Sequence, residues 1–382
     1  MHNRLFEEID RLNDCYLNMW EDVGNLESPT NDKAGVDAVG RYFAEKAREK
    51  GWTVEIYPQP VSGDVVVITL NPEAPGAPLA LSGHIDTVHP VGLFGSPAVK
   101  RDETKIYGPG VNDCKGGVVA GFMAMDALEK CGFNSRPVML LLQTDEEVGS
   151  KYSNTATIRY ICEKALGSVA FLNLEGHNAG KAVLARKGIL RYEFTVNGAA
   201  GHSSKCCTEG ASAILEAAHK IIKLETLKNP EGLTCNCGTI SGGTAANSVP
   251  AKCTFVADIR FSLPEEQEWV KNFVEEVAET THVPGCSCEV KQLSFRPSMP
   301  LTEKNLALLD TVNGILEQTG LPTLRHTKSA GGSDAAYVTE YGIPCIDSIG
   351  VEGGNIHSKN EYSLLNSLAE SAKRLAAVAW YI

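Results

Sequence analysis

Several features that would place this 382-residue chain in other protein classes are missing from it. No apolar run approaches the ~18 residues of a membrane-spanning helix, and the N-terminus lacks a basic stretch leading into an apolar segment with a small-residue cleavage site. We therefore expect a cytoplasmic protein with no membrane partner. Lys and Arg number 35 against 47 Asp and Glu, a net charge of −12. This shortage of basic residues argues against nucleic acid as a partner, because phosphate binding needs clustered Lys and Arg.

Nucleotide-binding signatures are also absent. No predicted strand is followed by the G-x-G-x-x-G pattern of a dinucleotide site. The segment from Gly331 to Asp334 is glycine-rich, but it lacks the lysine and the strand-loop-helix context of a phosphate-binding loop. A nucleotide-binding α/β protein remains an alternative that no motif supports.

The twelve cysteines lack the C-x-x-C spacing of common zinc sites. Seven lie between Cys206 and Cys288, and most of these are adjacent or one residue apart. This is not the arrangement of a disulfide framework in a small secreted domain. We expect free thiols that mostly pack inside the protein, with a redox or disulfide role as the alternative.

The apolar patterns that are present predict two α/β-type domains, one inserted in the other. Helical spacing and short buried apolar runs, typical of a mostly parallel sheet, alternate in the first part of the chain. Helices are predicted at 5–19, 36–47 and 116–130, and strands at 65–70, 79–81, 138–142 and 169–174. Further strands are predicted at 191–196, 234–240, 252–261 and 287–293, with helices at 211–227 and 265–281.

The middle elements follow the order β-α-β-β-α-β, the split arrangement of a ferredoxin-like sandwich. After Pro300 the α/β pattern resumes, with a strand at 345–349 and helices at 305–318 and 364–377. We therefore predict a discontinuous domain at residues 1–186 and 299–382, and an inserted domain at 187–298.

Residues suited to metal binding stand where several predicted strands end. Imidazole nitrogen and carboxylate oxygen are zinc ligands, and a catalytic zinc keeps one position open for water. The set has two histidines and enough carboxylates for two zinc ions. Its members are His84, Asp86, Asp113, Glu146, Glu147, Glu175 and, far along the chain, His357.

Each motif taken alone also has a structural explanation. His84 is compatible with an ordinary hydrogen-bonded residue at a strand end, although Asp86 lies on the same face and is suited to fix its tautomer. Asp113 is compatible with a helix cap. Glu146 and Glu147 are compatible with a solvated acidic turn, or with a division of work in which one carboxylate holds metal and the other takes a proton from water.

Together these motifs resemble one family in order, residue type and spacing. The segments Gly83–Thr87, Gly331–Ala336 and Ile356–Ser358 are similar to those of dinuclear zinc peptidases. That family includes aminoacylase, acetylornithine deacetylase, succinyl-diaminopimelate desuccinylase and bacterial glutamate carboxypeptidase. The resemblance covers nearly the whole chain. It implies an α/β fold in which a zinc-exopeptidase-type catalytic domain with a mostly parallel central sheet carries an inserted ferredoxin-like α+β lid and dimerisation domain.

The resemblance also implies two Zn²⁺ per subunit, for which Co²⁺ or Mn²⁺ could substitute. The implied ligands are His84, Asp113 and Glu175 for one ion, and Asp113, Glu147 and His357 for the other. Asp86 would orient His84, and Glu146 would be the general base. Family members commonly have a second Asp where this chain has Cys114, and the resemblance implies a cis peptide bond between Asp113 and Cys114.

Residues for substrate are implied in the same way. His202 would stabilise the oxyanion from across a homodimer, while Asn247 and Arg260 would hold a substrate carboxylate. By itself, Arg260 is an ordinary strand residue. Gly331, Gly332 and Ser333 would line the substrate site.

The substrate expected from the resemblance is a small peptide or N-acyl amino acid with a free carboxylate. Aminotripeptidase relatives usually carry Asp where this chain has Glu175, which favours a carboxypeptidase or a deacylase. We expect a glutamate carboxypeptidase-like metallopeptidase. An N-acyl-amino-acid deacylase or dipeptidase is the alternative, and a non-catalytic zinc assembly protein is a remote one.

Overall fold

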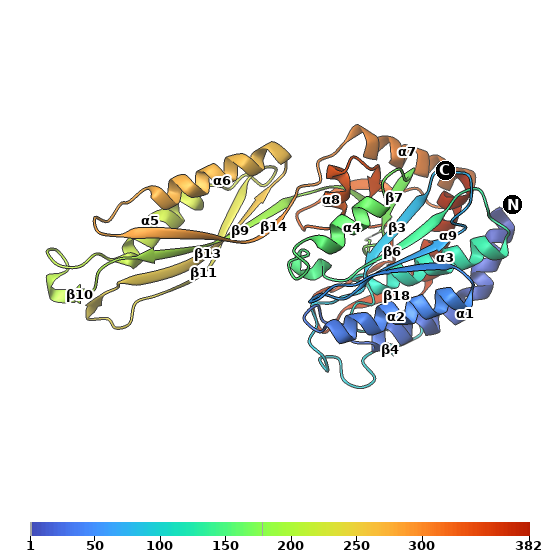
Figure 1. The fold of residues 1–382 in the computed structure, drawn as a ribbon, viewed down its shortest axis with the longest axis horizontal. Helices are drawn as coiled ribbons and strands as arrows, with labels where there is room; N and C mark the ends of the chain where they lie inside the picture. The colour runs from blue at the N-terminus through green and yellow to red at the C-terminus, as the bar shows by residue number, and fades with distance from the viewer. Residues whose placement is uncertain (1, 178) are drawn as a thin grey trace. The chain divides into compact units, whose positions relative to one another are not determined.

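The structure, a computed structural model, describes residues 2–177 and 179–382, and their contacts form two units (Figure 1). The first unit comprises Met1–Leu184, Leu301–Lys328 and Ser333–Ile382. The second comprises Ala185–Pro300 and Ser329–Gly332. No helix in the described part of the chain is long and apolar enough to cross a membrane.

A six-stranded sheet with the strand order β1-β2-β6-β3-β7-β16 forms the centre of the first unit. Its strands are β1 (Thr53–Tyr57), β2 (Val65–Leu70), β3 (Leu79–His84), β6 (Val138–Gln143), β7 (Ala170–Asn173) and β16 (Cys345–Ile346). The four strands β6, β3, β7 and β16 run parallel, whereas β1 and β2 are antiparallel to their neighbours. The predicted mostly parallel sheet is confirmed, although β2 itself is antiparallel. Its apolar run reflects burial of both faces, which does not depend on strand direction.

Helices cover both faces of this sheet (Figure 1). Leu81 and Leu140 belong to the same hydrophobic cluster as residues of α1, α3 and α9. Their neighbours Ala80 and Leu141 point to the other face and are equally buried, where α4 contacts β6 and α8 contacts β16. The helices of the unit are α1 (His2–Asn25), α2 (Lys33–Glu49), α3 (Lys115–Lys130), α4 (Ala156–Lys164), α7 (Glu303–Gln318), α8 (Ala335–Glu340) and α9 (Asn366–Tyr381).

Short strands fix the loops beside the main sheet. A four-stranded sheet has the order β17-β18-β5-β4. It consists of β4 (Lys100–Arg101), β5 (Lys105–Tyr107), β17 (Gly353–Gly354) and β18 (Tyr362–Leu364). A separate pair joins β8 (Lys181–Arg186) to β15 (Arg325–Ser329). The β17–β18 connection contains His357, so pairing with β5 holds the distant end of the chain in the first unit.

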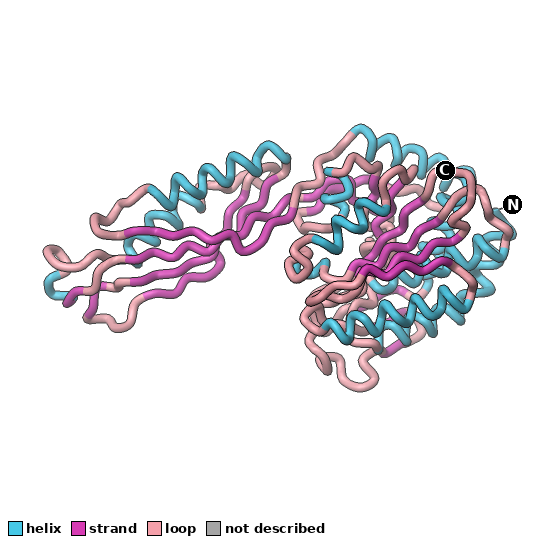
Figure 2. The backbone as a smooth tube through the Cα atoms, in the orientation of Figure 1, coloured by secondary structure: helices cyan, strands magenta, loops and turns pink. Residues whose placement is uncertain are grey.

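The second unit is a ferredoxin-like sandwich, as predicted. Its antiparallel sheet has the order β11-β13-β9-β14, and two helices cover one face (Figure 2). Burial alternates along β9, and Phe194 stacks on Phe255 of β13 with ring centroids 4.6 Å apart. The elements are β9 (Gly188–Asn197), α5 (Ala213–Leu224), β11 (Thr234–Gly242), β13 (Lys252–Phe261), α6 (Pro264–Glu279) and β14 (Ser287–Arg296). A small pair, β10 (Gly201–His202) with β12 (Ser248–Val249), lies in the β9–α5 and β11–β13 connections.

Candidate metal centre

The fold gathers the predicted metal-type residues at the carboxyl ends of parallel strands. His84 is the last residue of β3, and Glu175 lies two residues after β7. Glu146 and Glu147 begin η1 (Glu146–Val148), the short 3₁₀-helix that follows β6. Since β3, β6 and β7 are parallel neighbours, their carboxyl ends meet at one edge of the sheet, where open α/β sheets bind ligands. The loop before α3 adds Asp113 to this edge, and the β17–β18 connection adds His357.

Asp113 stands between two groups of possible ligands. Its Oδ1 lies 3.0 Å from His84 Nε2, and its Oδ2 lies 3.0 Å from His357 Nε2. On the first side, Glu175 Oε1 is 3.7 Å from His84 Nε2. On the second side, Glu147 Oε2 is 3.3 Å from His357 Nε2. One carboxylate is thus shared by two pairs, each of which consists of an imidazole and a glutamate.

Asp86 links His84 to the acidic turn. The Nδ1 atom of His84 lies 3.0 Å from the backbone oxygen of Asp86 and 3.5 Å from its carboxylate. The same carboxylate accepts hydrogen bonds from the backbone N–H groups of Glu146 and Glu147, both at 3.2 Å. Thr30 also donates to it, at 2.8 Å. Asp86 therefore fixes the start of η1 as well as the ring of His84.

The electrostatics of the cluster show an excess of carboxylate over cation. Burial raises the pKa of Glu175 well above its usual range and that of Glu147 to about 7. Hydrogen bonds to Asp113 and Glu147 raise the pKa of His357 to about 10. Burial opposes ionisation of Asp113 too, but hydrogen bonds from His357 and His84 hold its pKa below its usual range. Buried carboxylates that share two imidazoles fit a divalent cation, which supplies the missing positive charge.

The ligand atoms are also close enough for a metal ion. Those of His84, Asp113 and Glu147 all lie within 4.8 Å of one another, as do those of His84, Cys114 and Glu175. Their nitrogen and carboxylate oxygen atoms are the donors that zinc accepts in catalytic sites.

Cys114 is turned towards the backbone of the site. The peptide bond between Asp113 and Cys114 is cis, as the resemblance implied. The thiol is fully buried, accepts a hydrogen bond from the N–H of His84 at 3.0 Å and donates to the oxygen of His84 at 3.4 Å. Burial raises the pKa of this thiol above its usual range, so the neutral form predominates in the metal-free protein.

The backbone of Asp113 is held by a pair of residues, Glu361 and His89, that the sequence interpretation did not identify. Glu361 Oε1 accepts the N–H groups of Asn112 at 2.9 Å and Asp113 at 3.0 Å. Its Oε2 lies 2.7 Å from Nε2 of His89. His89 follows His84 by five residues and Glu361 follows His357 by four, but these spacings match no metal motif. Their contact becomes visible only in the fold.

The predicted substrate residues fall in both units. In the second unit, the Arg260 guanidinium is held by Asp258 (Nε to Oδ1, 2.5 Å) and donates to the backbone oxygen of Ala330 at 3.4 Å. This places Arg260 beside the segment that contains Gly331 and Gly332, whose oxygens accept from Arg186. Ser333 is buried in the first unit, where its hydroxyl accepts from Asn173 at 3.0 Å.

His202 and Asn247 adjoin each other in the second unit. His202 ends β10 and is exposed, with Nδ1 2.8 Å from Ser204 Oγ. Asn247 precedes β12, and its backbone oxygen accepts the N–H of Ser203 at 3.0 Å. Neither side chain belongs to the metal-type cluster of the first unit.

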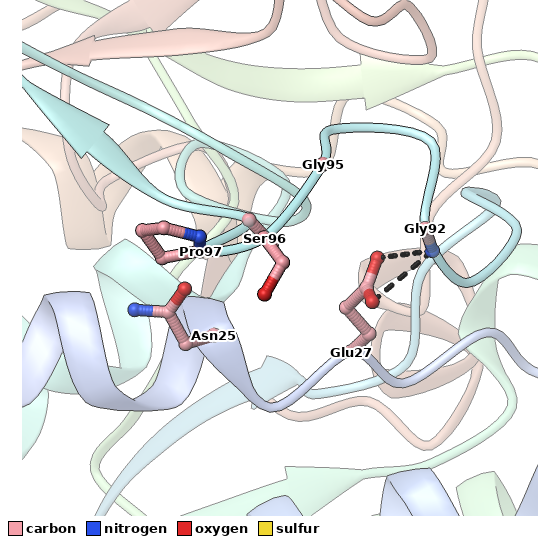
Figure 3. A pocket seen from close by; sticks show the side chains of 7 residues that line it. Asn25, Glu27, Gly92, Gly95, Ser96 and Pro97 are labelled. Atoms are coloured by element: carbon pink, nitrogen blue, oxygen red, sulfur yellow. Dashed lines mark hydrogen bonds between the residues drawn. The ribbon is translucent and has the colours of Figure 1, made fainter.

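A pocket on the first unit is lined by none of the metal-type residues. Its walls are the end of α1 and the loop after β3 (Figure 3). The Glu27 carboxylate accepts the N–H of Gly92 through both oxygens, at 2.9 and 3.1 Å. This contact anchors the loop that follows His84 and His89.

The chemistry of this cluster is that of a metal-dependent hydrolase. More specifically, the chain belongs to peptidase family M20/M25/M40, because the model of that family matches residues 80–381. It is therefore a metallopeptidase or amidohydrolase. Carboxypeptidase G2 of Pseudomonas sp. (strain RS-16) is 28% identical over 367 residues, covering 94% of this chain and 87% of that protein. Acetylornithine deacetylase of Myxococcus xanthus is 30% identical over 330 residues, or 80% of each chain.

Solved structures share the fold. Aminopeptidase PepT from Bacillus cereus matches with a TM-score of 0.78 and 21% identity, covering 97% of this chain and 98% of that one. A dinuclear metal-binding peptidase of the same family from Bacillus subtilis matches with a TM-score of 0.67 and 18% identity, covering 98% and 100%.

Proposed function

We propose that the protein is a zinc-dependent exopeptidase that releases a C-terminal amino acid from a small peptide. The observation that carries this proposal is the position of the Asp113 carboxylate. One of its oxygens lies 3.0 Å from His84 Nε2, and the other lies 3.0 Å from His357 Nε2. A carboxylate placed in this way is suited to bridge two ions. The similarity to carboxypeptidase G2 supports the reaction type.

The residues that would hold two Zn²⁺ are His84, Asp113 and Glu175 on one side and Asp113, Glu147 and His357 on the other. Co²⁺ and Mn²⁺ fit the same donors. When bound, such ions make water more acidic and polarise an amide carbonyl. We also propose that this chemistry takes place in the cytoplasm.

The protein's own residues would then carry the proton and orient the substrate. Glu146, which is 7% exposed and fixed at its N–H by Asp86, would take a proton from the attacking water and return it to the leaving amine. His202 would donate a hydrogen bond to the developing oxyanion. Arg260, beside Gly331 and Gly332 and with Ser333 further along that segment, would bind the terminal carboxylate of the substrate. Asn247 adjoins His202 at the opposite end of β13, and would contact this carboxylate together with His202 from the partner subunit.

A deacylase of N-acyl amino acids is the second candidate, supported by the 30% identity to acetylornithine deacetylase. It would use the same metals and the same carboxylate contact, and so would a dipeptidase. The two differ in the group on the other side of the scissile amide. A metal protein without activity is the remote alternative, and the presence of Glu146 next to Glu147 argues against it.

The experiment that tests the carboxypeptidase assignment is a comparison of peptides with free and amidated C-termini, alongside N-acyl amino acids. Wild-type protein should cleave the free acids and leave the amidated peptides nearly intact. Arg260→Ala should raise KM for free acids by about 10-fold or more, because a charge-assisted contact of ~1.5–3 kcal/mol is lost. Arg191→Ala is the matched control, since Arg191 contacts the same Asp258 carboxylate. Equal wild-type activity on both kinds of C-terminus would exclude the carboxypeptidase.

We also propose that the second unit, at about residues 187–298, is a lid and forms a homodimer. Its helix α5 exposes Leu215 (51%) and Ile222 (69%), and β11 is an edge strand that exposes Ile240 (56%). Exposed apolar side chains beside an unpaired strand edge favour pairing with a second copy across a two-fold axis.

A further inference from the structure

A buried contact between a histidine and a glutamate connects the segments on which the candidate metal ligands lie. Glu361 and His89 are 1% and 4% exposed, and their side chains meet at 2.7 Å although they are 272 residues apart. His89 lies in the segment that begins with His84, and Glu361 lies in the segment that begins with His357. The pair therefore ties together the two histidine-bearing segments.

The same pair contacts the third segment, which contains Asp113. Glu361 Oε1 accepts two adjacent backbone N–H groups, those of Asn112 and Asp113. Its Oε2 meets Nε2 of His89 at 2.7 Å, so both carboxylate oxygens of Glu361 have partners. It thus fixes the main chain directly behind the carboxylate that faces both His84 and His357.

We propose that Glu361 and His89 form a positioning pair that sets Asp113 between the two metal positions. The proposal rests on the proposed function, because it assumes that Asp113 is the shared ligand. It assigns neither residue to the reaction itself. Its consequence is that loss of the pair should weaken both metals together, since both share Asp113. Loss of Glu147 should weaken only one.

Contacts that do not involve the Glu361 carboxylate hold the backbone around the pair. Glu361 N–H donates to the oxygen of Ser358 at 3.1 Å, and Glu361 oxygen accepts from Gly108 at 3.4 Å. His89 also packs edge-on against Phe94, with centroids 5.0 Å apart. These contacts do not involve the carboxylate, so Glu361→Gln and Glu361→Ala change the support of Asp113 with little change to the path of the chain.

The same loop offers a matched control. Glu27 anchors Gly92, three residues after His89 (Figure 3). Among the described residues, no hydrogen bond joins its carboxylate to Glu361 or Asp113. Glu27→Ala therefore loosens the loop and leaves the support of Asp113 intact.

The test is zinc binding by the full-length protein, measured by metal content after dialysis against zinc buffers. Cobalt-loaded protein is measured in parallel by its visible absorption spectrum. Outer partners of metal ligands typically contribute 10–100-fold to affinity. Glu361→Ala should lose affinity to about that extent at both ions, and its cobalt spectrum should change. Glu361→Gln should show a smaller loss, because an amide oxygen still accepts the N–H groups but more weakly. His89→Ala should lose affinity as well, and the double variant should be little worse than Glu361→Ala.

Several outcomes would overturn the pairing. The pairing would be wrong if folded Glu361→Gln and His89→Ala kept the zinc affinity and the cobalt spectrum of the wild-type protein. This comparison holds even if Glu361→Ala fails to fold. Equal weakening by Glu27→Ala would show that loop anchoring in general, and not this pair, supports the site. If the Glu361 variants lost only one ion, the pair would not act through Asp113, because both metal positions share that residue. Failure of wild-type protein to bind zinc would instead overturn the proposed function.

Discussion

At the scale of single residues, Glu146 and Glu147 are adjacent, and we propose different roles for their carboxylates. Glu147 Oε2 lies 3.3 Å from His357 Nε2, and burial raises its pKa to about 7. The peptide N–H of Glu146 donates to Oδ1 of Asp86 and that of Glu147 donates to Oδ2, so Asp86 fixes the backbone of both residues.

We predict that Glu146→Gln keeps the metal content and loses most turnover, by about 10²–10⁴-fold for a general base. Glu147→Gln should also lose one metal, because a ligand is removed. Metal analysis and kinetics on the same preparations check both statements. Near-normal kcat in Glu146→Gln would exclude it as the base.

Cys114 presents a choice between metal ligand and structural residue. Its thiol hydrogen-bonds the backbone of His84, and burial favours its neutral form. We predict that Cys114→Ser keeps both metals. Cys114→Ala should also keep them but lose about 1–3 kcal/mol of unfolding free energy, since the N–H of His84 loses its acceptor.

The spectrum of cobalt-loaded protein decides between these roles. A structural thiol gives no thiolate-to-metal charge-transfer band. Such a band in wild-type protein, lost in Cys114→Ser, would make Cys114 a ligand and would contradict our interpretation.

At the scale of elements, buried strands and amphipathic helices were predictable where one pattern dominated. The strands predicted at Val65–Leu70 and Lys252–Phe261 match β2 and β13 to the residue. The strand predicted at 345–349 ends at Ile346 instead, because Ser348 has a φ of 59°. Strand β1 is mostly exposed, so the polar residues of Thr53–Tyr57 carry no buried-strand signal.

The candidate site was predictable in part for a similar reason. Ligand-type residues at strand ends are visible in the sequence, and their family resemblance suggests how they group. Glu361 and His89 were not predictable, because their roles depend on a contact between distant loops. The sequence records residue types, but it does not record which loops meet.

The side chains of Glu147 and His357 should make the stability of the metal-free protein depend on pH. The folded pKa values of Glu147 (about 7, from 4.5) and His357 (about 10, from 6.5) are both raised. Folded protein therefore binds more protons than the unfolded chain between these values, and its stability falls as pH rises through them. Asp113, with a lowered pKa, acts in the opposite direction only at lower pH.

We predict that the Tm of chelator-treated protein falls from about pH 5 to about pH 9. Zinc should raise the Tm more at the upper end, because metal binds the deprotonated ligands. Thermal unfolding with and without zinc across this range measures both effects. If Tm changed with pH in the same way with and without zinc, Glu147 and His357 would not titrate as the metal-free structure predicts.

At the scale of the whole molecule, the proposed dimer would build each active site from residues of both subunits. We predict that mixing inactive Glu146→Gln protein with inactive His202→Ala protein restores roughly a quarter of wild-type activity. Half of randomly exchanged two-fold dimers are mixed, and each mixed dimer has one site with both residues intact. Activity after mixing, with subunit exchange followed independently, checks this.

The dimer itself requires a separate measurement. Ile222→Glu should shift the protein to monomers and abolish the restored activity. Val91→Glu, which adds the same charge to an exposed apolar position of the first unit, should leave the mass unchanged. Exchange without recovered activity would show that His202 does not act across the dimer.

The order in which the chain is synthesised has a consequence for metal uptake. His84, Asp113, Glu147 and Glu175 precede the entire second unit, whereas His357 and Glu361 follow it. A ribosome must therefore finish the inserted domain before the second proposed metal position can be closed. Until then the growing first unit holds acidic side chains without their last histidine, and a message cut short after the second unit would yield a chain that folds its insertion but cannot retain a full metal pair.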